Sequence, residues 1–151
     1  FENLVLSSLG TIEDSSTYSI AIYSDKSAKY RTFKSDNKLS NSGIIHKRDS
    51  YEYIGTVDTC FNKFNELVAL INYLNLPKAK DVYSSFDDYE ITYQFTYRYN
   101  QVQTKTITFQ YDDATRGLQE LFNRIDGMKE DMFIWKKNQA KENLINDLNC
   151  T

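Results

Sequence analysis

The clearest alternation of hydrophobic and polar positions runs from Tyr89 to Asn100. Every odd position carries an aromatic or aliphatic side chain and every even position a polar one. This two-residue period is typical of a strand with one buried and one solvated face. A second alternating stretch follows, in which Ile107, Phe109 and Tyr111 share one side. The two stretches together predict a hairpin.

The loop of this hairpin determines which side chains meet across it. A three-residue loop through Val102 places Phe95 opposite Ile107 and Tyr93 opposite Phe109, so that apolar residues face one another. A two-residue loop would slip the register by one position and turn every side chain of one strand to the wrong face. We therefore expect the three-residue loop, or a bulge beside it.

A helix is predicted directly after the hairpin. Apolar residues recur at spacings of three and four from Leu118 to Trp135, which places them on one side of a helix. Asp112 or Asp113 is the expected cap of its first turn. Because glycine in a helix costs about 1 kcal/mol relative to alanine, Gly127 predicts a bend or a break.

The first half of the chain shows a similar order of elements. An alternating stretch at residues 18–23 and a strand-like stretch at residues 29–34 surround a polar turn. Apolar residues at helical spacing follow at positions 61–74, with Asp58 as the expected cap and Pro77 just after the end. Strand, strand and helix thus occur twice, a tandem strand-strand-helix duplication of structure that implies no common ancestry of the two halves.

The two halves differ because residues 35–56 intervene in the first. This segment contains a polar stretch at Ser35 to Gly43 and two short strand candidates, Ile44 to His46 and Tyr51 to Ile54. The polar residues Lys47 to Ser50 between the candidates predict a turn there.

These elements predict an α+β fold. With a further strand at residues 3–9, we expect an antiparallel sheet of about five to seven strands, packed on one face by two main helices. The length of 151 residues suits one domain, 1–151. Its tentative halves are 1–76 and 81–135, and residues 136–151 are expected to form a helical extension.

Composition narrows the class of partner. A hydrophobic fraction of 40% suits a packed core, and no run of apolar residues is long enough for a membrane span. The net charge of -3 provides no general attraction to nucleic acid. We therefore expect another protein as the partner, while the sequence does not set the oligomeric state.

Few residues suit catalysis or metal binding. His46 is the only histidine, and neither cysteine has the spacing of a metal-ligand motif. The acidic pairs Asp87-Asp88 and Asp112-Asp113 occur where strands and helices begin, which favours turns and caps. Motifs that cradle phosphates or dinucleotides are missing. We expect no metal, no cofactor and no catalytic residues.

The two cysteines leave a choice open. A disulfide between Cys60 and Cys150 would close a loop of about ninety residues and stabilise the fold by roughly 4 to 5 kcal/mol. In a reducing compartment the same residues would be two free thiols. The disulfide would favour a secreted or periplasmic location over a cytoplasmic one.

Tyrosine is the most abundant aromatic residue, with 12 copies. The alternating tyrosines of residues 89–99 are expected in the core beneath the helices, since their opposite face is polar. Tyrosines outside that alternation are better candidates for exposed contacts. With the histidine and arginine of the intervening segment, the candidate binding residues are Tyr23, Tyr51, Tyr53, Tyr83, His46 and Arg48.

Two functional hypotheses follow. The favoured one is a non-enzymatic interaction protein, such as a secreted or periplasmic binding module, an inhibitor or an immunity-type protein. Its contacts would come from residues 35–54 and from the segment after Trp135, because both exceed what a minimal two-layer core requires. The alternative is a small enzyme or small-molecule binder with a cleft between sheet and helices.

Overall fold

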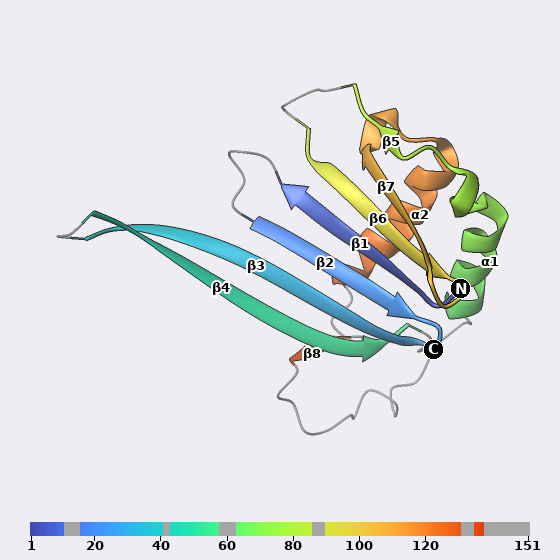
Figure 1. Ribbon diagram of the computed structural model, residues 1–151. Helices are drawn as coiled ribbons and strands as arrows, with labels where there is room; N and C mark the ends of the chain where they lie inside the picture. Colours follow the sequence, from blue (N-terminus) through green and yellow to red (C-terminus); the bar gives the residue numbers. More distant parts are fainter. Residues whose placement is uncertain (11–15, 41–42, 58–62, 86–89, 131–134, 138–151) are drawn as a thin grey trace.

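Figure 1 shows the computed structural model of the chain. The structure describes residues 1–10, 16–40, 43–57, 63–85, 90–130 and 135–137. Within its strands, residues 10, 16, 33–40, 43–50, 136 and 137 are described by their backbone alone.

The described residues form one eight-stranded sheet. The strands are β1 (Asn3–Gly10), β2 (Ser16–Tyr23), β3 (Ser27–Ser40), β4 (Gly43–Thr56), β5 (Val82–Tyr83), β6 (Thr92–Tyr99), β7 (Gln103–Gln110) and β8 (Lys136–Lys137). Their order across the sheet is β5-β7-β6-β1-β2-β3-β4-β8. All neighbours are antiparallel except β5 and β7. The N-terminal strand is therefore central, between the hairpin β2-β3 and the hairpin β6-β7.

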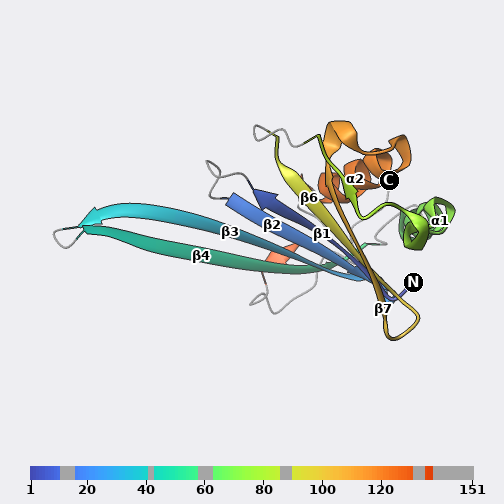
Figure 2. The same cartoon turned by 45° about the horizontal axis from the view of Figure 1, so that its top comes forward.

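In the part of the chain that the structure describes, two α-helices lie on one face of this sheet, as Figures 1 and 2 show. They are α1 (Lys63–Leu74) and α2 (Arg116–Gly127), with short 3₁₀ helices η1 (Leu76–Lys78), η2 (Tyr111–Asp113) and η3 (Met128–Glu130) beside them. The α+β layout with two main helices on one face is thus confirmed. The strand number is slightly higher than expected because two strands have only two residues each.

The buried hydrophobic residues that the structure describes form one core between the sheet and the helices. Most of its fully buried residues come from β1, β2, β6, β7 and the two α-helices, as alternation in the strands and helical spacing predict, with Ala28 of β3 and Leu76 of η1 in addition. The largest are Phe95, Phe109, Leu4, Leu6, Ile20, Ile22, Ile71, Leu76, Ile107, Leu121 and Ile125.

The β6-β7 hairpin has the predicted register. Tyr93 pairs with Phe109 and Phe95 with Ile107, and the loop bends through two residues with positive φ, Asn100 at 56° and Gln101 at 55°. The ring of Tyr93 lies with its centroid 4.5 Å from that of Phe122 on α2. The prediction that the tyrosine row faces the helices is therefore confirmed.

The predicted cap of the second helix is wrong. Asp112 and Asp113 belong to η2, and the N-cap of α2 is Thr115, whose side chain accepts a hydrogen bond from the Leu118 N–H at 3.3 Å. Ala114, which has an extended backbone, separates η2 from Thr115, so neither aspartate adjoins the first residue of the helix. The helix ends at Gly127, where a break was expected. The predicted cap of the first helix, Asp58, lies outside the described residues.

The predicted helical extension is wrong at its beginning. Lys136 and Lys137 form the strand β8, which pairs with Ile54 and Tyr53 of β4. An open sheet edge offers backbone hydrogen bonds, and these hold the two lysines in an extended conformation. Residues 138–151 lie outside the described part of the chain.

The intervening segment also differs from the sequence prediction. No turn occurs at Lys47 to Ser50, because β4 runs without a break from Gly43 to Thr56 and pairs with β3 along its whole length. The pairing extends as far as Ser40 with Gly43. The register that Tyr30 and Tyr53 set in the body of the sheet continues through the polar residues.

Candidate interaction surface

The outer part of the β3-β4 hairpin projects beyond the sheet. Strand β2 accompanies β3 only as far as the pair of Ser16 with Lys34. We call residues 35–40 of β3 and 43–48 of β4 the arm. Figures 1 and 2 show it reaching past the ends of the other strands and away from both helices. Among the residues that the structure describes, the two strands of the arm have only each other as strand neighbours.

Two of the residue pairs within the arm are complementary across the strands. Asp36 pairs with Lys47, which places opposite charges at one register position, and Leu39 pairs with Ile44, which places two apolar residues at another. Such pairs each stabilise a hairpin by roughly 0.2–1 kcal/mol. An isolated two-stranded ribbon is only marginally stable in water. The arm therefore depends on its continuation into the body of the sheet.

The arm differs in charge from the rest of the molecule. Between residues 35 and 48 the sequence has three basic residues, Lys38, Lys47 and Arg48, and one acidic residue, Asp36. These give a net charge of +2 in a chain whose total is -3. The remaining residues thus sum to -5, and a partner approaching the arm meets a locally positive segment.

A cluster of aromatic side chains lies where the arm joins the sheet. We call Tyr18, Tyr30, Tyr51, Tyr53 and Trp135 the aromatic base. The ring centroid of Tyr30 is 5.6 Å from that of Tyr53, 5.8 Å from that of Trp135 and 6.3 Å from that of Tyr18. The pairings of Tyr30 with Tyr53 and of Thr32 with Tyr18 and Tyr51 place these tyrosines on the helix-covered face.

Exposure within the aromatic base increases toward the arm. Trp135 is 8% exposed, and its indole N–H donates to the Met128 carbonyl oxygen at 2.5 Å. Tyr53 is half-buried, while Tyr51, two residues nearer the arm, is 45% exposed. An aromatic side chain that is partly open to solvent at the edge of a rigid cluster suits a protein contact.

A polar contact fixes the aromatic base to α2. The Tyr18 hydroxyl donates to the Asp126 carboxylate. The Lys129 ammonium lies 2.8 Å from the same carboxylate and 4.1 Å from the centroid of the Tyr18 ring. Burial, and then the hydrogen bond to this carboxylate, raise the pKa of Tyr18 well above its ordinary value. The hydroxyl therefore stays protonated and joins β2 to the end of the helix.

The structure brings some of the predicted binding residues together. Tyr51 and Tyr53 lie in the aromatic base, and His46 and Arg48 lie on the same strand within the arm. The side chains of His46 and Arg48 are outside the description.

The other two predicted tyrosines lie elsewhere. Tyr23 ends β2, with the Lys29 ammonium 6.0 Å from its ring centroid. Tyr83 is on β5 at the far edge of the sheet, where its hydroxyl accepts from the Lys80 N–H at 3.1 Å. Three strands, β7, β6 and β1, separate β5 from β2. These two tyrosines therefore do not share a surface with each other or with the arm.

Sequence analysis did not identify Tyr18, Tyr30 and Trp135 as members of this site. Tyr18 lies in an alternating stretch and Trp135 at helical spacing, which are patterns typical of core residues and do not indicate a contact surface. Their place beside the arm depends on the pairing of Tyr30 with Tyr53. The signal that could have found it is the match between the two strand candidates at residues 29–34 and 51–54.

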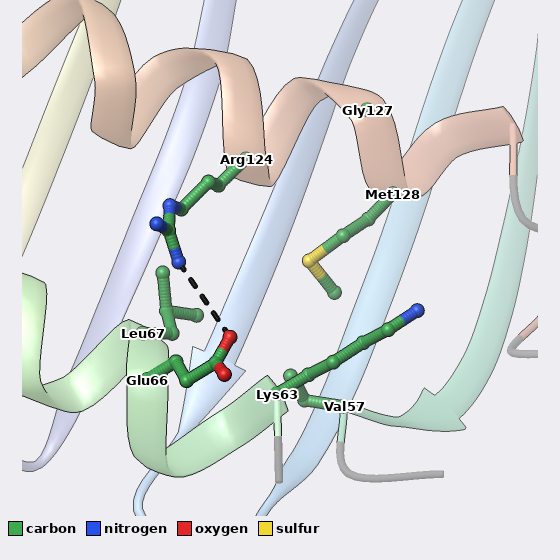
Figure 3. Close-up of a pocket in the computed structure, with 7 residues that line it drawn as sticks. All are labelled: Val57, Lys63, Glu66, Leu67, Arg124, Gly127 and Met128. Carbon is green, nitrogen blue, oxygen red and sulfur yellow. Dashed lines mark ion pairs between the residues drawn. The ribbon is translucent and has the colours of Figure 1, made fainter. Parts of the chain in front are cut away.

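A separate cavity of about 310 Å³ lies between the beginning of α1 and the end of α2. Figure 3 shows its lining, in which Arg124 points toward Glu66 across the cavity. The Arg124 guanidinium is 3.9 Å from the Glu66 carboxylate and 2.9 Å from that of Glu120. Both carboxylates balance its charge. The lining residues are Val57, Lys63, Glu66, Leu67, Arg124, Gly127 and Met128.

Other classes of site have no support in the described residues. No three histidine, cysteine, aspartate or glutamate side chains lie close enough there to hold a metal ion together. None of the helices in this part of the chain is both long and apolar enough to span a membrane. Cys60 and Cys150 lie outside the described residues, so their pairing remains a sequence prediction.

Comparison with known proteins adds no family. Neither a protein-family model, nor a curated protein, nor a solved structure matches the chain. Inference about function therefore depends on the geometry of the arm, the aromatic base and the cavity.

Proposed function

We propose that this chain is a protein-interaction domain that binds its partner through the arm and the aromatic base. The observation that carries the proposal is the projection of the arm, a two-stranded ribbon that extends past β2 with no third strand beside it among the described residues. Open strand edges pair readily with other chains, and protein sheets usually keep them short or cover them. A long projecting ribbon therefore fits a surface that a partner covers.

The aromatic base supports the same proposal. A contact surface is commonly anchored by tyrosine and tryptophan in a rigid setting, with charged residues around it. Here Tyr53 stacks on Tyr30, Tyr30 contacts the buried Trp135, and Tyr51 is the exposed member. The basic arm adjoins this cluster. The combined surface favours a protein partner with an apolar centre.

Photo-crosslinking at single positions tests this proposal. A photoreactive amino acid at Asn37 places the probe in the arm, and the same residue at Tyr73, which is 85% exposed on α1, is the matched control. The full chain is returned to its source cells or extract and irradiated. We expect a discrete crosslinked protein from position 37 and none from position 73.

A variant without the arm supplies the second measurement. Because Lys34 pairs with Asp49, a two-residue Asn-Gly loop can replace residues 35–48 and close the shortened hairpin. The crosslinked protein, once identified and purified, should bind the full chain and bind this variant at least about tenfold more weakly. Equal binding of both forms would contradict the proposed function.

The cavity between the helices favours a second candidate, a small-molecule binder. Its volume of about 310 Å³ is at the lower end of ligand sites, and its walls combine Leu67 and Met128 with Lys63 and Arg124. Native mass spectrometry of the full chain purified from its source is the test. A ligand that copurifies with it, and is lost when Leu67→Trp fills the cavity, would favour this candidate.

A further inference from the structure

We propose that the β3 edge of the arm pairs with the same edge of a second copy of the chain. The two edges would run antiparallel around a twofold axis at Asn37. This inference rests on the proposed function of the arm as an interaction surface, and it names the partner that the arm fits. The contact would be isologous, with the same residues contributed by both copies.

Charge complementarity selects this register. When Asn37 lies opposite Asn37 of the second copy, Asp36 lies opposite Lys38 and Lys38 opposite Asp36. The contact thus contains two pairs of opposite charge with a pair of amides between them. Shifting the axis by one position places Asp36 opposite Asp36 of the second copy, or Lys38 opposite Lys38. Like charges directly opposite each other destabilise the pairing of two strands.

The other edge of the arm is a poorer match to itself. Residues 43–48 of β4 include two basic residues, Lys47 and Arg48, and no acidic one, so no register of this edge with itself forms a pair of opposite charge. An axis at His46 sets Lys47 opposite Ile45. The β3 edge is therefore the one whose sequence is complementary to a second copy.

The length of the open edge fits a short ladder. Toward the body of the sheet, the open edge ends at Lys34, because Lys34 pairs with Ser16 of β2. At the tip it ends at Ser40, the last residue of β3. Five residues, 35–39, can pair with 39–35 of the second copy, which is an ordinary strand length. Because the strands run antiparallel, the two bodies lie at opposite ends of the contact.

Two single charge reversals test this pairing. Asp36→Lys and Lys38→Asp each place like charges at both positions when a variant meets its own copy. In a mixture of the two variants, one chain is positive at positions 36 and 38 and the other is negative at both. Both opposite-charge pairs therefore return when the two variants pair with each other. Sedimentation velocity over a range of concentrations measures the association of each sample.

We expect the unmodified chain to form a dimer whose dissociation constant rises at least about tenfold in either variant alone. An equimolar mixture should return to within about threefold of the unmodified value. Lys78→Asp and Asp112→Lys, which change the charge by the same amounts far from the arm, are the controls and should dimerise normally. Recovery in the mixture also shows that both variants are folded.

Three results would overturn this inference. The unmodified chain could stay monomeric at the highest concentration tested, its dimer could resist both reversals, or the mixture could stay as weak as the separate variants. If the chain is monomeric while crosslinking from position 37 captures a different protein, the proposed function stands and only the second copy is wrong. If neither occurs, both proposals fail.

Discussion

At the scale of single residues, Tyr18 shows how one side chain joins the two layers. Its strand alternation places it on the helix side of the sheet, yet its hydroxyl needs a polar partner when partly buried. The Asp126 carboxylate at the end of α2 supplies that partner, and Lys129 balances its charge. This arrangement holds the end of α2 against β2. The contact lies beside the other rings of the aromatic base, where the arm joins the sheet.

Replacing Tyr18 with phenylalanine should lower the free energy of unfolding near neutral pH by about 1–2 kcal/mol, because the charged hydrogen bond is lost. The pKa of Tyr18 is raised in the folded chain, so the unfolded chain loses this proton first. Stability therefore falls as the pH rises above about 10, and Tyr18→Phe should make that fall shallower. Urea unfolding at a series of pH values measures both effects.

Tyr73→Phe is the control for this prediction, since Tyr73 is 85% exposed. It should change neither the stability near neutral pH nor the alkaline dependence beyond experimental error. The same alkaline slope for Tyr18→Phe and the unmodified chain would show that the hydroxyl does not keep its proton through contact with Asp126.

At the scale of elements, α2 begins after a threonine, rather than an aspartate, whose side chain accepts a hydrogen bond from an N–H group of the first turn. Thr115 has the extended backbone of an N-cap, and its hydroxyl accepts from the Leu118 N–H. Asp113 instead accepts from the Ser85 N–H at 2.8 Å, so it fixes the segment after β5. The contact of Thr115 is local, whereas that of Asp113 joins two segments that are 28 residues apart in the chain.

Thr115→Ala should therefore destabilise the fold by about 1 kcal/mol, the usual effect of losing an N-cap. Asp112→Ala, on the preceding 3₁₀ turn, should change the free energy of unfolding by no more than about 0.5 kcal/mol. Thermal or urea unfolding of the two variants compares them directly. A larger loss for Asp112→Ala than for Thr115→Ala would contradict the observed cap.

The contrast between the two hairpins shows how far the sequence alone leads. For β6-β7, strict alternation of apolar and polar residues fixed both strands and their register, because only one register buries the tyrosine row. For β3-β4, residues 35–43 are nearly all polar and carry no such period. Their pairing comes from the register of Tyr30 with Tyr53 in the body.

The candidate site, like the two hairpins, could be predicted only in part from the sequence. Tyr51 and Tyr53 were identified because they fall outside the main alternation. Tyr30 and Trp135 could not be identified from the sequence, since their contact joins β3 to a residue that follows α2. Contacts between segments so distant in the chain leave no local pattern.

At the scale of the whole molecule, the body and the arm have different requirements. The body has one buried core beneath two helices, whereas neither helix reaches the arm (Figure 1). The arm is thus an addition to a fold that is complete without it. Such a division allows the surface to be removed while the body remains.

Replacing residues 35–48 with Asn-Gly should accordingly leave the body folded. We expect one cooperative unfolding transition whose free energy changes by no more than about 1 kcal/mol, as for surface changes. The near-UV circular dichroism of Trp135 should keep its folded signal, because this side chain packs on Tyr30 in the body. A non-cooperative transition would show that the arm is part of the folding unit.

The continuous pairing of β3 and β4 is the feature on which both proposals depend. Nuclear Overhauser contacts between backbone protons in an isotope-labelled sample of the full chain measure it directly. The structure predicts cross-strand contacts between residues 37 and 46 and between residues 40 and 43. Contacts between residues 46 and 51 around a turn at 47–50 would instead contradict the arm and the function proposed for it.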